Sequence, residues 1–202
     1  MRKEESVAIV GYGETPTSRG RADRGELRLS TEEYIAWASD LALKNAGLTK
    51  KDIDHQGLAV AGTTTRSGEL WSSTVAHNLG LNPKLLLRGD QGGMSPTSFI
   101  VQSYLAIKAG LVDTVLCVGG ESPMSEPAIP PTFKHLWEFG APFGMMGANS
   151  LFAFVMRRHM YQYGTKFEHT GQIAVVQRQH SCLNPNAYMK KPISLDDYLQ
   201  SK

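Results

Sequence analysis

Cysteine is scarce in this chain, with two among 202 residues. Cys117 lies in an apolar run and Cys182 in a polar segment, and no CxxC pair or metal-ligand spacing occurs. We therefore expect neither a disulfide framework nor a metal centre. Both cysteines are expected to be small packing residues.

An excess of charge of one sign is also missing. The 21 basic and 19 acidic residues give a formal net charge of +2, whereas nucleic-acid-binding domains concentrate basic residues on one face. Nucleic acid is therefore not an expected partner. One arginine-rich run, which lies among Gly, Ser and Asp residues, is typical of a solvated loop, with contact to an anionic ligand as the alternative. Its members are Arg19, Arg21, Arg24 and Arg28.

Long apolar runs are absent as well. No stretch reaches the roughly 18 consecutive apolar residues that a membrane-spanning helix needs. The opening Met-Arg-Lys-Glu-Glu leads directly into the strand-like segment 7–10. We expect a soluble, cytoplasmic protein. Its hydrophobic content of 41% is enough for the core of one ordinary domain.

Strand and helix patterns alternate over the first 120 residues. Ser30 and Glu33 form a capping box that predicts a helix start, and Gly47 predicts its end. Further helices are expected at 70–79 and 95–109. Strands are predicted at 7–10, 53–61, 84–87 and 114–118. This order predicts a parallel or mixed α/β sheet.

The predicted helix 95–109 has apolar or small residues on nearly every face, which indicates burial between two layers. Ser95 followed by Pro96 predicts an N-cap and a first-turn proline; a nucleophilic Ser95 is the alternative, although no base is identifiable beside it. Beyond residue 120 the pattern changes to helices at 145–163 and 167–181, with no further strand.

Several short motifs follow one another along the chain: Val7–Pro16, Arg88–Pro96, Ala109–Asp113, Gly119–Ser122, His159–Thr165 and Asn184–Ala187 with Pro192 and Ile193. Taken in this order, they resemble the thiolase superfamily, and within it the sterol-carrier-protein and lipid-transfer-protein branch. The resemblance covers nearly the whole chain and implies a layered αβαβα fold of two similar α/β halves. This chain would hold the N-terminal half only: an α/β core over 1–120 and a mostly helical loop domain over 121–202, ending before the last strand of that half.

The resemblance places the family's reactive cysteine at Gly93. In a thiolase that cysteine starts a buried helix, where the helix dipole favours the thiolate and backbone N–H groups hold an oxyanion. Glycine cannot be acylated, but its N–H can still act as the oxyanion donor; the alternative is that Gly93 only permits close packing. Met146 and Gly147 resemble a Met-Gly pair that touches acyl-CoA, with core packing as the alternative, and Ser95 is a further substrate-binding candidate.

The resemblance favours an enzyme that uses a CoA thioester as substrate and needs no cofactor or metal. Some relatives of this branch that lack the cysteine are aldolases, which cleave a β-hydroxyacyl-CoA, often a steroid side-chain derivative; the resemblance thus implies a steroid or other lipid side chain as the acyl group. The alternatives are an acetyl-CoA acetyltransferase and a non-catalytic lipid- or CoA-binding subunit. Expected partners are acyl-CoA and either a second copy or a different chain. That chain would supply the C-terminal half or be a zinc-ribbon/OB-fold accessory subunit.

Overall fold

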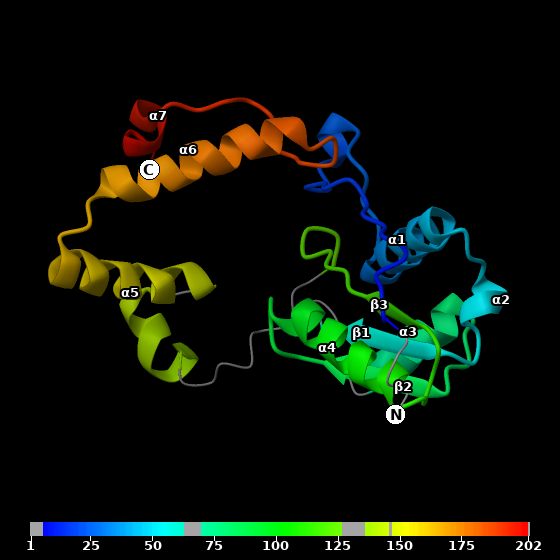
Figure 1. Ribbon diagram of the computed structural model, residues 1–202. Helices are drawn as coiled ribbons and strands as arrows, with labels where there is room; N and C mark the ends of the chain where they lie inside the picture. Colours follow the sequence, from blue (N-terminus) through cyan, green and yellow to red (C-terminus); the bar gives the residue numbers. More distant parts are fainter. Residues whose placement is uncertain (1–5, 63–69, 127–135, 146, 202) are drawn as a thin grey trace. The chain divides into compact units, whose positions relative to one another are not determined.

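The computed structural model describes residues 6–62, 70–126, 136–145 and 147–201 (Figure 1). The chain forms two compact units, residues 1–130 and 131–202. Unit 1 contains a parallel sheet with helices, and the described part of unit 2 is helical.

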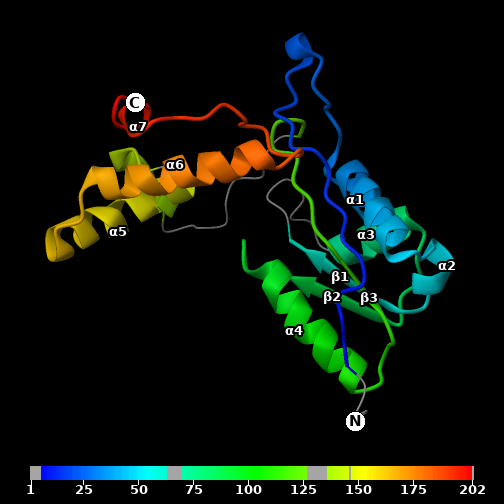
Figure 2. The same cartoon turned by 45° about the horizontal axis from the view of Figure 1, so that its top comes forward.

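Unit 1 is built on three parallel strands: β1 (Gly57–Ala61), β2 (Leu85–Gly89) and β3 (Val115–Val118). Their order is β2-β1-β3, and Gly57 of the central strand faces Leu85 on one side and Val115 on the other. Helices α1 (Thr31–Ala46) and α3 (Trp71–Leu79) pack on one face, and α4 (Ser95–Lys108) packs on the opposite face (Figure 2). The predicted α/β layering is confirmed in this unit.

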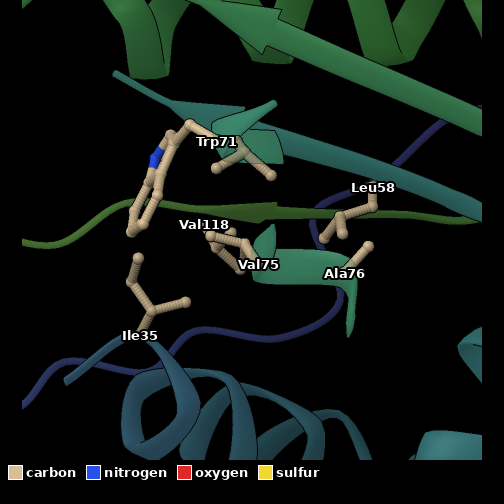
Figure 3. Close-up of a cluster of buried hydrophobic side chains, with 7 residues drawn as sticks. Ile35, Leu58, Trp71, Val75, Ala76 and Val118 are labelled. Atoms are coloured by element: carbon tan, nitrogen blue, oxygen red, sulfur yellow. The ribbon is translucent and has the colours of Figure 1, made fainter. Parts of the chain in front are cut away.

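The core lies between the central strand and the α1/α3 layer (Figure 3). Leu58 and Val60 are two residues apart on β1, so the two-residue period of a strand points both side chains into this layer. Trp71 closes the carboxyl end of β1 by donating from Nε1 to the Ala61 carbonyl at 3.0 Å. The buried cluster consists of Ile35, Leu58, Val60, Trp71, Val75, Ala76 and Val118.

The capping box that the sequence predicts for α1 is confirmed. The Glu33 N–H donates to Ser30 Oγ at 3.2 Å, and the Ser30 N–H donates to Glu33 Oε2 at 2.7 Å. Gly47 ends the helix with φ of 68°, a left-handed conformation that glycine adopts without strain.

The predicted strand 53–61 is too long at its start. Ile53 instead ends a one-turn helix, α2 (Lys50–Ile53), and β1 begins at Gly57. Asp52 is the reason: its carboxylate accepts from the Thr49 N–H and hydroxyl at 2.7 and 2.6 Å, which caps this turn.

The predicted strand at 7–10 is wrong in the described structure. The segment is not paired in the sheet, and Ile9 and Val10 are 77% and 63% exposed. A strand requires hydrogen bonds from a neighbour, and the described residues supply none to this segment. Directly after it, Gly11 and Gly13 pass close to α1: a Cβ at these positions would lie 2.5 Å from the Ala42 oxygen and 2.3 Å from the Ala38 oxygen, respectively.

Within unit 1, the described residues cover helix α4 on one side only. Phe99, Ser103 and Ala106 are buried. Four large side chains on the rest of its surface are between 47% and 59% exposed, so within this structure the helix lacks the second layer that its composition predicts. These four residues, which we call the α4 apolar face, are Ile100, Val101, Tyr104 and Leu105.

Unit 2 contains α5 (Gly147–Tyr163), α6 (Phe167–Leu183) and α7 (Leu195–Leu199) after two short turns, Leu136–Gly140 and Ala141–Phe143. The chain after α6 folds back along it (Figure 2). Among the described residues, no helix combines the length and apolar content that a membrane crossing requires.

Gly171 is the contact point between α6 and α7. A Cβ added there would lie 2.5 Å from Leu195 Cδ1 and 2.7 Å from Tyr198 Cδ1, so only glycine lets α7 approach this closely. Beside it, Thr170 Oγ1 and the Tyr198 hydroxyl are hydrogen-bonded at 3.0 Å. Arg178 Nη1 adds a 2.8 Å bond to the Lys191 carbonyl.

Gly171→Val should detach α7 from α6. The added side chain overlaps Leu195 and Tyr198, and overpacking of this kind costs about 1–3 kcal/mol. Limited proteolysis followed by mass spectrometry should show faster cleavage after residue 184. Gln172→Val, which places the same side chain at an exposed neighbouring position, should leave the cleavage rate unchanged. Equal cleavage of both variants would contradict the role given to Gly171.

The α4 apolar face should make the isolated chain self-associate, because contiguous exposed apolar surface favours association. Sedimentation velocity should show oligomers that dissociate when Val101 and Leu105 are both replaced by Lys. Replacing the exposed Ser73 and Asn78 of α3 by Lys adds the same charge elsewhere and should not change the distribution. A monomeric wild-type chain over the micromolar range would refute this expectation.

Candidate functional site

The candidate site is the loop that joins β2 to α4. Residues 90–94 follow the carboxyl end of β2, and in open parallel sheets ligands bind outside this edge. Gly89 brings the loop close to α4, since a Cβ there would lie 2.6 Å from Phe99 Cε1. Gly92 has φ of 57°, which glycine accommodates and other residues rarely adopt.

Hydrogen bonds within the loop hold it in one conformation. The Met94 and Ser95 N–H groups donate to the carbonyls of Gln91 and Gly92 at 3.3 and 3.1 Å. The Gln91 N–H donates to Ser95 Oγ at 2.9 Å, and Ser95 is only 2% exposed. The loop is therefore closed on itself by a buried side chain.

Ser95 is the first residue of α4, and Met94 is its N-cap, so the predicted capping role of Ser95 is wrong. Its hydroxyl instead reaches back to Gln91, because Met94 already has helical backbone angles and the helix starts one residue earlier than the serine pattern suggests. In the described part of the chain, no imidazole or carboxylate is bonded to Ser95 Oγ. This arrangement suits a structural lock better than a nucleophile.

Gly93 faces open space. A Cβ at this position would meet no described atom within 4 Å, and Gly93 does not have a positive φ. Neither packing nor backbone strain within the described residues therefore calls for glycine, unlike at Gly92 or Gly89. The close-packing interpretation of Gly93 has no support here, and the position is accessible to a ligand that approaches the start of α4.

Asp90 is a loop residue that the sequence pattern did not single out. Its side chain contacts the end of β1, since a Cβ on Gly62 would lie 2.7 Å from Asp90 Cγ, and Arg88 Nη2 lies 3.9 Å from Asp90 Oδ2. Only its position directly after an apolar strand could have drawn attention to it.

The remaining predicted site residues belong to unit 2. Gly147 is the first residue of α5, and Met146 lies outside the described residues. Gly93 thus lies in the β2–α4 loop and Ser95 at the start of α4, and the role of the Met-Gly pair stays a prediction.

Both cysteines are free, and Cys182 is half-buried. Cys117 on β3 is exposed in the described structure, so its predicted role as a packing residue is not confirmed. Its Sγ lies 3.4 Å from Ser103 Oγ of α4, and partial desolvation of the thiol raises its pKa. Cys182 on α6 donates from Sγ to the Lys190 carbonyl at 3.0 Å. The described residues contain no group of three His, Cys, Asp or Glu side chains placed to hold a metal ion.

A cavity of about 310 Å³ lies beside the carboxyl end of β3. Its walls include Gly13–Ser18 and Gly119–Ser125. Glu126 secures the second wall to the start of α1: its Oε2 accepts from the Thr31 N–H at 3.1 Å, from Thr31 Oγ1 at 2.7 Å and from Ser122 Oγ at 2.5 Å. A carboxylate at a helix N-terminus also interacts favourably with the helix dipole.

Known proteins similar to this chain include enzymes of CoA-thioester metabolism. The chain is 30% identical to a steroid side-chain-cleaving aldolase of Thermomonospora curvata, over 98% of this chain and 50% of the relative. It is 31% identical to an acetyl-CoA acetyltransferase of Methanocaldococcus jannaschii, over 96% and 49%. The chain thus spans about half the length of the curated relatives it matches. No family model matches it.

Solved structures support the same relationship. The Ltp2-ChsH2(DUF35) aldolase superposes with a TM-score of 0.80 and 27% identity, over 96% of this chain and 48% of that chain. The three-layered unit 1 therefore has a thiolase-like fold. The homologues of this chain, sterol carrier protein 2 among them, are thus SCP2-thiolase-like proteins, and the chain matches their N-terminal, thiolase-like half.

Proposed function

We propose that this chain is the thiolase-like part of a lyase that cleaves a carbon–carbon bond of a β-hydroxyacyl-CoA by an aldol-type reaction. The observation that carries this proposal is Gly93: the start of α4 is open to a ligand, and no nucleophile stands there. The names of two relatives support the same chemistry, a steroid side-chain-cleaving aldolase and a 17-hydroxy-3-oxo-4-pregnene-20-carboxyl-CoA lyase of Mycobacterium tuberculosis. We accordingly propose a steroid or similar lipid side chain as the acyl group.

The reaction needs a base and an oxyanion site but no covalent intermediate. A base removes the proton of the β-hydroxyl group, the Cα–Cβ bond breaks, and Cβ leaves as a ketone or aldehyde. The bonding electrons pass to the thioester, which becomes an enolate, and protonation at Cα then gives the shortened acyl-CoA. Because negative charge develops on the thioester oxygen, fixed N–H donors at that oxygen lower the barrier.

The start of α4 supplies such a donor. Unsatisfied N–H groups and the positive end of the helix dipole favour an anion at this position. Met94 and Ser95 already donate their N–H groups within the loop, so we assign the oxyanion contact to the Gly93 N–H. Glycine allows the thioester to approach the backbone closely.

Thiolysis is the less suitable alternative, although an acetyl-CoA acetyltransferase is among the relatives. A thiolase nucleophile needs a lowered pKa, whereas partial desolvation raises the pKa of the Cys117 thiol. Cys182 belongs to α6 of unit 2, and its thiol is bonded to a carbonyl.

We further propose that the active enzyme is an oligomer that includes sequence not present here. The support is that this chain covers about half of its curated relatives and of the Ltp2-ChsH2(DUF35) aldolase chain. The added part would be a C-terminal half or an accessory subunit of the zinc-ribbon/OB-fold type. It would also supply the catalytic base.

Gly93→Val should abolish turnover without unfolding the protein. The new side chain meets no described atom of the chain itself, so it should crowd only the ligand. The substitution keeps the backbone N–H, but the side chain should hold the thioester oxygen away from it, and loss of one oxyanion contact costs about 100- to 1,000-fold in kcat. The assay is the complete assembly with β-hydroxyacyl-CoA and β-ketoacyl-CoA in parallel, and thermal melts control for folding. Gly93→Ala should lose less activity, and Gly93→Cys should not create thiolysis. Thiolysis by the wild-type assembly without aldol cleavage would overturn the proposal.

No acyl-enzyme should form. Incubation with acetyl-CoA or acetoacetyl-CoA should leave the intact protein mass unchanged, because no thiol lies at the start of α4 and the pKa of the Cys117 thiol on β3 is raised. A cysteine-containing thiolase, treated identically, serves as the positive control. An acetyl adduct mapped to Cys117, Cys182 or Ser95 would rule out the non-covalent mechanism.

A further inference from the structure

Residues 18–28 form a structured loop, which we call the arginine hairpin. All four of its basic residues are arginines, and they outnumber its two acidic residues, Asp23 and Glu26, by two. That excess equals the formal net charge of +2 of the whole chain, which leaves 17 basic and 17 acidic residues in the rest of it. The positive excess of this protein is therefore concentrated in eleven consecutive residues.

Glu26 organises the arginine hairpin from inside. Its Oε2 accepts from the backbone N–H groups of Arg19 and Arg21 at 3.0 and 3.2 Å, and its own N–H donates to the Arg21 carbonyl at 3.2 Å. The base of the loop is closed by Ser18 Oγ, which donates to the Leu27 carbonyl at 2.7 Å. One of the two carboxylates is thus bound to the backbone of the loop.

The tip of the hairpin is a single 3-10 turn, Ala22–Arg24, that ends at Gly25 with φ of 66°. Figure 2 shows this turn, in dark blue, at the end of a loop that projects beyond α1. Arg19, Arg24 and Arg28 are exposed, and Arg21 is half-buried. The base of the loop rests on residues 124–125, since a Cβ on Gly20 would lie 3.5 Å from Ser125 Oγ and 3.7 Å from Met124 Cβ.

We propose that the arginine hairpin is a docking surface for an acidic segment of a partner protein. Guanidinium groups bind carboxylates through two parallel hydrogen bonds, and a loop that is already ordered loses little conformational entropy on binding. A small anionic ligand fits less well, because small-molecule sites are concave and the cavity at the base of the loop is lined by Glu14 and Glu121 rather than by arginine. Nucleic acid fits less well because the rest of the chain is formally neutral.

Fluorescence anisotropy with a labelled 20-residue poly-L-glutamate and the complete chain tests this proposal. Binding should weaken steeply with salt, and Arg24→Gln with Arg28→Gln should weaken it at least tenfold. The matched control, Lys50→Gln with Lys51→Gln, removes two exposed cations from α2 and should change affinity less than twofold. Equal loss in both double variants would overturn the proposal.

The variant Glu26→Ala tests whether polyglutamate binding depends on the ordered conformation of the loop or only on its positive charge. The substitution removes a negative charge, so charge alone predicts tighter polyglutamate binding. It also removes the acceptor that holds the Arg19 and Arg21 N–H groups, so the hairpin model predicts binding at least threefold weaker. Tighter binding by Glu26→Ala would refute the model.

A comparison of ligands tests the class of partner. The wild-type chain should bind polyglutamate more tightly than adenosine 3′,5′-bisphosphate or a 20-nucleotide single-stranded DNA. If it binds either phosphate ligand more tightly, and the variant with Arg24→Gln and Arg28→Gln loses that binding, the surface is a phosphate site and the proposal is overturned.

Discussion

The pairing of β1 with two parallel neighbours is the constraint on which unit 1 depends. The side chains of β1 alternate between the α1/α3 layer and the α4 layer, so this central strand is buried on both faces. Because all three strands run in one direction, their carboxyl ends meet at one edge. The β2–α4 loop and the turn after β3 are therefore brought to the same side of the sheet. The parallel direction of the strands alone therefore places the loops of the candidate site at this edge, and no additional binding domain is needed to gather them.

Local signals in the sequence are sufficient for the longer helices and for the existence of the three strands of the sheet. Ser30 with Glu33 fixed the start of α1, because both hydrogen bonds of a capping box are made within four residues. The apolar segment 7–10 predicts a strand that the described structure does not contain, because an apolar run indicates only a local preference, whereas a strand requires hydrogen bonds from a neighbour. The strand predicted at Ile53 is wrong for a related reason: an apolar side chain can be buried in a short helix as readily as in a sheet.

The site was less predictable than the fold. Gly93 was identified through resemblance to a family, and nothing in composition or periodicity distinguishes it from Gly92. Only coordinates separate the two, since Gly92 has a left-handed backbone and Gly93 has free space where a side chain would be. Ser95 was interpreted as a cap because Ser-Pro is a common helix opening, but its bond to Gln91 depends on how the loop turns back. The hairpin arginines were visible in the sequence, whereas the bonds from Glu26 that order them were not.

The anchoring of Glu126 to Thr31 has a consequence for how unit 1 folds. The two residues are 95 positions apart, and Ser122 lies 91 positions from Thr31. Closing so long a loop costs entropy that only later contacts offset, and chains dominated by non-local contacts fold slowly. Helix α1 can form early from its own capping box, but it cannot dock at its N-terminus until β3 and the loop behind it are in place. The Thr31–Glu126 contact therefore requires that the first α-helix of this unit meet a segment that follows β3, the last strand of its sheet.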